Sequence, residues 1–108
     1  MMKRSLTADA REQLELARSH SGRAAITVFG GHEQSLRQTL IALLAGSEMK
    51  EHESPGEATM QVLSGRLRVN AGDDEWEGRD GDFIAIPQSR HSVTAITDAT
   101  FLLTVAKA

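Results

Sequence analysis

The segment GSEMKEHESPGEATMQVLSG, residues 46–65, carries the pattern that decides the fold. Its polar first half contains His52, and Pro55-Gly56 favours a turn near the middle. Residues 59–63 are mostly apolar or β-branched and predict a strand that ends at Ser64-Gly65. The order along the chain is therefore a histidine, a turn, a strand and a glycine.

A second segment, GDFIAIPQSRHSV at residues 81–93, repeats this order. A glycine precedes an alternating apolar run over residues 83–86, which Pro87 ends, and His91 follows. Imidazole suits divalent transition metals. We therefore expect the side chains of His52 and His91 to carry the chemistry of a functional site.

Composition excludes several classes of protein. The 108 residues suffice for one domain with its own core, and 40% apolar and 25% charged residues are typical of a soluble globular protein. A net charge of −3 argues against a nucleic-acid or anionic-membrane surface. The absence of cysteine excludes disulfides, thiolate metal sites and cysteine nucleophiles. Apolar runs are too short for a membrane span or a signal peptide, so we expect a cytoplasmic protein.

Elsewhere the pattern predicts one helix and several short strands. Thr7 or Asp9 is expected to cap the helix, which should end at Ser21-Gly22. Strands are expected at residues 24–29, 66–70, 75–77, 83–86, 91–95 and 100–106. Short strands with Gly, Pro, Asn and Asp in the turns between them indicate an all-β sandwich or barrel.

Residues 35–45, SLRQTLIALLA, fit two structures. The leucines recur at helical spacing, with Gly46 as a C-terminal glycine. A strand would instead have apolar residues on both faces, as a strand buried on both sides does. Periodicity leaves the two open, and we choose the strand because of the family resemblance that follows.

The two segments resemble the two sequence motifs of the cupin superfamily, over residues 36–106. The first cupin motif is a glycine, five residues, His-x-His, a spacer, a glutamate, six residues and a glycine. The second is a glycine, five residues, Pro-x-Gly and a histidine. The matching positions are Gly46, His52 and Gly65 in the first motif and, with a loop one residue shorter, Gly81, Pro87 and His91 in the second.

The resemblance implies a small single-domain cupin of the all-β class: a double-stranded β-helix, or jelly-roll barrel, with a short N-terminal helix. Residues 1–34 would form an N-terminal arm, helix and strand, and residues 35–108 the barrel. The barrel interior would bring both histidines together near one mouth. The resemblance also implies a homodimer, which we expect to form through the N-terminal segment.

Two of the family's four usual metal ligands are missing. Ser54 stands where cupins have the second histidine, and Ala58 where they have the glutamate. His52 and His91 remain as candidate ligands for the iron, manganese, nickel or zinc that relatives hold. Glu57 and Gln61 are secondary candidates, because strand alternation turns both away from the face expected to carry the site unless a bulge shifts the register.

Other residues complete the expected site. Met60 and Val62 are expected to line the core or a substrate pocket, and Arg90 either attracts an anionic substrate or is an exposed loop arginine. Trp76 is expected to anchor the barrel or an interface. His20 and His32 lie outside both motifs and are expected to be solvated.

Two function classes remain, and whether the protein is an enzyme stays open. In the first, His52 and His91 hold a divalent metal for dioxygenase or lyase chemistry on a small organic molecule. In the second, a metal-free domain binds or senses a small ligand without catalysis. A metal-free epimerase with a tyrosine acid is disfavoured because the chain has no tyrosine. We expect a small-molecule partner, no nucleic acid and no membrane.

Overall fold

The computed structural model describes residues 2–52 and 56–107, which form one helix and nine strands in two sheets. Along the chain these are α1 (Leu6–Ser19), β1 (Arg23–Phe29), β2 (Leu36–Leu43), β3 (Glu48–His52), β4 (Gly56–Ser64), β5 (Arg66–Ala71), β6 (Asp74–Arg79), β7 (Phe83–Ile86), β8 (His91–Ala95) and β9 (Ala99–Lys107).

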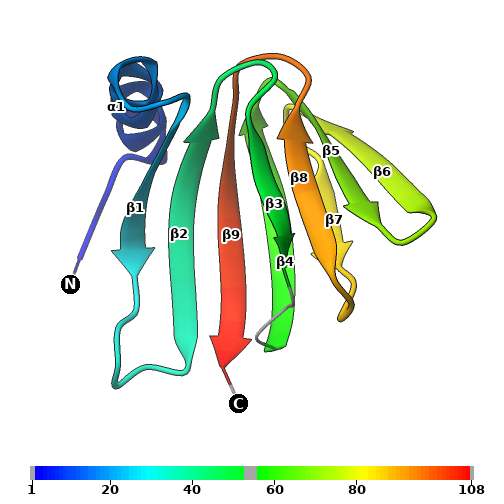
Figure 1. The fold of residues 1–108 in the computed structure, drawn as a ribbon. Helices are drawn as coiled ribbons and strands as arrows, with labels where there is room; N and C mark the ends of the chain where they lie inside the picture. Colours follow the sequence, from blue (N-terminus) through cyan, green and yellow to red (C-terminus); the bar gives the residue numbers. More distant parts are fainter. Residues whose placement is uncertain (1, 53–55, 108) are drawn as a thin grey trace.

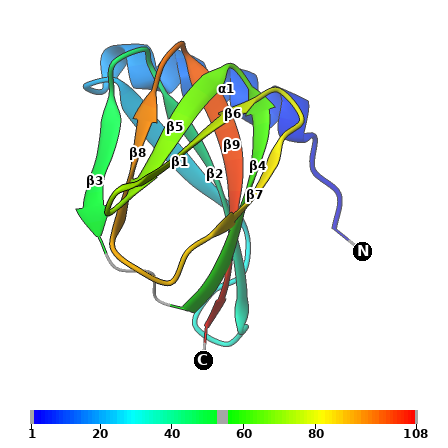
Figure 2. The same cartoon turned by 90° about the vertical axis from the view of Figure 1, so that its right-hand side faces the viewer.

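The two sheets are antiparallel and face each other (Figures 1 and 2). One has the strand order β1-β2-β9-β4-β7 and the other β3-β8-β5-β6. We call them the five-stranded and the four-stranded sheet. This arrangement confirms the expected all-β jelly roll with a short N-terminal helix. The division into residues 1–34 and 35–108 stays a prediction, and β1 hydrogen-bonds to β2 across that boundary.

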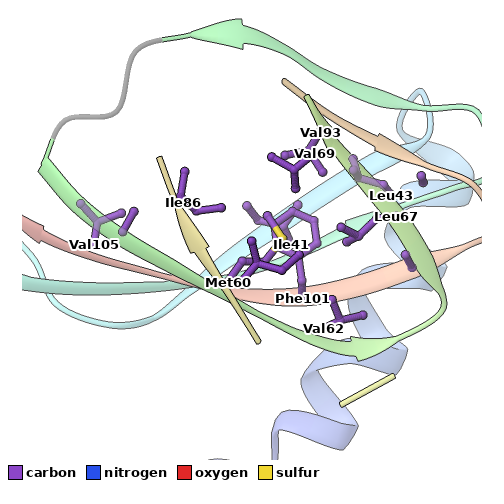
Figure 3. Packing of buried hydrophobic residues seen from close by; sticks show 14 residues of the cluster. Ile41, Leu43, Met60, Val62, Leu67, Val69, Ile86, Val93, Phe101 and Val105 are labelled. Atoms are coloured by element: carbon purple, nitrogen blue, oxygen red, sulfur yellow. The ribbon is translucent and has the colours of Figure 1, made fainter. Parts of the chain in front are cut away.

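The interior between the sheets is apolar. Phe101 is completely buried and Met60 almost so, and Figure 3 shows both side chains gathered with Ile41 between the strands. Val62 belongs to the same cluster. Met60 and Val62 are therefore core residues, and a role for them in lining a ligand pocket stays a prediction.

Helix α1 packs against the outer face of the five-stranded sheet. Leu6 and Ala10 lie against a buried cluster that contains Leu40 and Leu102. The Ser5 hydroxyl accepts a hydrogen bond from the Ala8 amide at 3.1 Å and caps the helix. The predicted cap at Thr7 or Asp9 is therefore wrong, because both residues lie inside the helix.

Residues Leu36–Leu43 form strand β2, as the family resemblance predicts and as helical spacing alone does not. Leu40 faces the cluster under α1, while Ile41 and Leu43 face the interior between the sheets. Burial on both faces explains the continuous apolar run.

Two boundaries near the first motif differ from the prediction. The polar residues Glu48–His52 form strand β3 at the edge of the four-stranded sheet. The predicted turn at Pro55-Gly56 is only partly testable, since Pro55 lies outside the described residues. Gly56 already belongs to β4, and a Cβ there would lie 2.5 Å from the Ala106 carbonyl oxygen, so this strand start requires glycine.

No helix in the described part of the chain has both the length and the apolar content that a membrane crossing requires.

Candidate ligand site at the histidine pair

Strands β3 and β8 bring the two motif histidines into register. They pair antiparallel, with the Cα atoms of His52 and His91 opposite each other and Met49 opposite Val93. The ladder has an irregularity between Met49 and His52. The side chain of His52 lies outside what the structure describes. The backbone therefore places the two motif histidines at neighbouring positions of one sheet.

His91 is the first residue of β8 and is only 5% exposed. It shares the buried face of the strand with Val93 and Ala95. Its Nδ1 lies 3.0 Å from the Ser89 carbonyl oxygen. A carbonyl only accepts, so Nδ1 carries the hydrogen, and in the neutral ring Nε2 bears the lone pair. A backbone carbonyl that fixes the tautomer in this way is common among histidines that bind metals or ligands.

Glu57 and Gln61 do not join this site. The register of β4 against β9 is regular from Gly56 to Val62, so no bulge turns Glu57 inward. Glu57 and Gln61 are exposed, whereas Ala58 is buried on the interior side. The methyl group of Ala58 thus occupies the position where the family's carboxylate ligand would stand.

The donors in residues 2–52 and 56–107 do not fit the four-ligand cupin metal site. Among the side chains that the structure describes, in residues 2–51 and 56–106, no group of three or more His, Asp or Glu residues is placed to hold a metal ion. Ala58 offers no donor atom, and Ser54 lies outside the described residues. His52 and His91 stay the predicted pair.

Charged side chains lie both next to His91 and on the outer face of the same sheet. The Arg90 guanidinium, next to His91, forms an ion pair with Glu51 of β3 at 3.0 Å. On the outer face of β5 and β6, Arg66 and Arg68 both hydrogen-bond to Glu77, and these bonds lower the pKa of the Glu77 carboxyl. The charge of Arg90 is therefore partly balanced at the rim, which weakens its attraction for an anion.

Sequence reasoning missed the contribution of β3. This strand carries Glu51 and His52 to the edge of β8, but its polar residues give no apolar run to detect. The only hint of a strand in this segment is the apolar Met49 between two charged residues, and Met49 does pack against the core.

The sequence and the fold both have counterparts among known proteins. The sequence model of the cupin domain matches residues 39–106. The chain belongs to the cupin family. This confirms the resemblance drawn from the two motifs. No curated protein matches this cupin in sequence.

Solved structures share the fold of this cupin. A conserved protein of unknown function from Streptococcus pyogenes is 27% identical, with 82% of this chain and 77% of that chain covered and a TM-score of 0.74. A cupin superfamily protein from Desulfitobacterium hafniense is 14% identical, covers 80% of this chain and 78% of its own, and has a TM-score of 0.73.

Salicylate 1,2-dioxygenase from Pseudoaminobacter salicylatoxidans, solved in complex with gentisate, is also similar. It is 24% identical, with a TM-score of 0.79 over 96% of this chain. The cupin covers 32% of the dioxygenase chain, about a third of its length. At this identity the likeness establishes the fold alone.

Proposed function

We propose that this cupin binds a small organic molecule beside His52 and His91 and does so without the family's four-ligand metal centre. The observation that carries the proposal is the backbone pairing of the two histidines, with His91 buried and its ring oriented by the Ser89 carbonyl. The two imidazoles would contact the polar group of the ligand, and apolar side chains near His91 would contact its hydrocarbon part.

Burial of His91 supports a functional role. His91 is buried beside Val93, and its hydrogen bond to the Ser89 carbonyl offsets the cost of burying one ring nitrogen.

A metal-dependent dioxygenase or lyase is the second candidate function. The same pairing of His52 with His91 favours it, together with the structural likeness to a dioxygenase over nearly the whole chain. Iron, manganese, nickel or zinc would then be held by the two imidazoles and by donors of the bound molecule itself. Such an ion would supply Lewis-acid or redox chemistry, and Ala58 would contribute nothing to its binding.

Metal content and ligand binding separate the two candidates. We would measure metals by mass spectrometry in untagged protein purified without chelator, and titrate metal-free protein with gentisate and salicylate by calorimetry. Binding to metal-free protein, lost in His91→Gln and kept in His32→Gln, supports the first proposal. The control changes a histidine that is exposed and outside both motifs. Near-stoichiometric metal that is needed for binding would overturn it in favour of the second.

The homodimer also stays a proposal. Sedimentation equilibrium on the full chain tests it, and a variant without residues 2–20 would be monomeric if the N-terminal segment forms the contact.

A further inference from the structure

Trp76 lies on the interior side of the four-stranded sheet. On β6 the neighbouring residue Glu77 pairs with Arg68 on the exposed outer face. Gly78, two residues from Trp76, is buried, and a Cβ there would lie 3.0 Å from Val62 in the core. Because alternate residues of a strand share a side, Trp76 is on the side of Gly78. The register agrees, since Trp76 pairs with Val69, which is fully buried.

Despite this inward side, Trp76 is 39% exposed. Strand β6 is one edge of the four-stranded sheet, and β7 is one edge of the five-stranded sheet. Figure 2 shows β6 and β7 meeting at the turn between them and running apart from there. Gly78 lies at the end where they meet and Trp76 further from it. The indole therefore occupies the rim of the interior, with one part in contact with water.

Trp76 lies within reach of the site of His91. Val69 pairs with Trp76 on one side and with Val93 on the other, and His91 is two residues from Val93 on the same face. Sheet geometry then separates the Cα atoms of Trp76 and His91 by about 10 Å across the strands and about 7 Å along them. The buried Ala71, at the end of β5, is a small residue on the same side. Trp76, Val69 and His91 therefore share the interior side of the four-stranded sheet.

We propose that Trp76 is a stacking wall of this site and that it selects ligands with a planar aromatic ring. The inference rests on the proposed function, because it needs a ligand held beside His91. A flat ring of the ligand would lie against the indole, as aromatic pairs do, while its polar group reaches the histidine. A saturated ring of similar size and charge has no flat face, so its contact with the indole would contribute less to the binding affinity.

The molecule supplies its own reporter for the test. Trp76 is the only tryptophan and the chain has no tyrosine, so intrinsic fluorescence reports the surroundings of this indole. We would titrate the full chain with benzoate and with cyclohexanecarboxylate, exciting at the red edge of the indole band, where neither acid absorbs. Calorimetry gives the affinities independently of the fluorescence.

We expect benzoate to change the fluorescence and to bind roughly threefold to tenfold more tightly than cyclohexanecarboxylate, the range that an aromatic pair gives. Trp76→Leu should remove this preference, and Trp76→Phe should keep most of it. The matched control is Phe83→Leu, because Phe83 is 60% exposed on the outer side of β7 and should leave both affinities unchanged. Circular dichroism of each variant verifies that the fold is kept.

The measurements distinguish a failure of the stacking inference from a failure of the proposed function. If both acids bind equally, and binding depends on His91 but not on Trp76, the stacking inference is overturned while the proposed function stands. If neither acid binds the unchanged protein, the stacking inference is overturned, whereas the proposed function is decided by the titrations with gentisate and salicylate. If Trp76→Leu leaves binding unchanged but dissociates a dimer, the indole is an interface anchor, which also overturns the inference.

Discussion

Replacing Gly65 by alanine tests how closely the turn between β4 and β5 approaches the rest of the fold. Gly65 has a φ of +85°, and a Cβ built on it would lie 2.0 Å from the Asp98 carbonyl oxygen. Its amide also donates to Asp80 Oδ1 at 2.7 Å. Alanine would therefore meet backbone that cannot rotate away. Gly46 has the same φ of +85° with nothing within 4 Å of the added Cβ, so it is the matched control.

The two variants separate two costs. Alanine in the left-handed conformation costs roughly 1–2 kcal/mol, and both variants bear this. Overpacking adds about 1–3 kcal/mol in Gly65→Ala alone. The free energy of unfolding should therefore fall by about 1–2 kcal/mol in Gly46→Ala and by about 2–5 kcal/mol in Gly65→Ala.

Thermal unfolding followed by circular dichroism measures the difference. For a domain of this size about 1 kcal/mol corresponds to about 4 °C in Tm. Gly65→Ala should then unfold about 4–12 °C below Gly46→Ala, or fail to fold at all. Equal losses of Tm in the two variants would refute the close approach of Gly65 to the Asp98 carbonyl.

Two further predictions concern the helix cap and the outer charges. Ser5→Ala should lower the free energy of unfolding by about 1 kcal/mol, because the Ala8 amide loses its acceptor, whereas Thr7→Ala should have little effect; urea unfolding of both variants checks this. The pKa of Glu77, read from a carbon-13 NMR titration, should lie below its ordinary value and return toward it in Arg66→Gln/Arg68→Gln. Because folding lowers this pKa, Glu77 stabilises the folded protein at pH values above the ordinary pKa of glutamate, and this contribution is lost as the pH falls through the folded-state pKa. If the pKa of Glu77 were the same in the double variant, the two arginines would not be the cause of the shift.

The architecture could be predicted from glycine, proline and histidine spacing, but single elements needed tertiary information. Residues 36–43 have the composition of a helix, and they form a strand because α1 covers one face and the core covers the other. The local sequence preference of a segment does not show whether other parts of the chain will cover both of its faces. Ser5 was missed as the cap because Thr7 and Asp9 offer equally good side chains and the choice between them depends on where the first turn begins.

The candidate site was predicted in part. The motif spacing predicts His91 as a site residue, which stays a prediction, and the structure adds its burial and the Ser89 carbonyl that orients it. The position of Trp76 required the register of β6 against β5, since the sequence DEWEGR is charged on both sides of the indole and shows no apolar alternation. The outward turn of Glu57 was predicted from alternation, and the regular register of β4 accounts for it.

The position of β9 has a consequence for how the chain acquires its structure. Residues 99–107 lie between β2 and β4 in the five-stranded sheet, and those two strands are joined only through β9. Leu36, for example, pairs with Ala106. During synthesis on the ribosome, strands β1 and β2 therefore cannot join β4 in the sheet until the segment up to residue 107 has emerged. Such long-range pairing slows folding and exposes strand edges in the meantime, so this cupin should be prone to aggregate until β9 has paired.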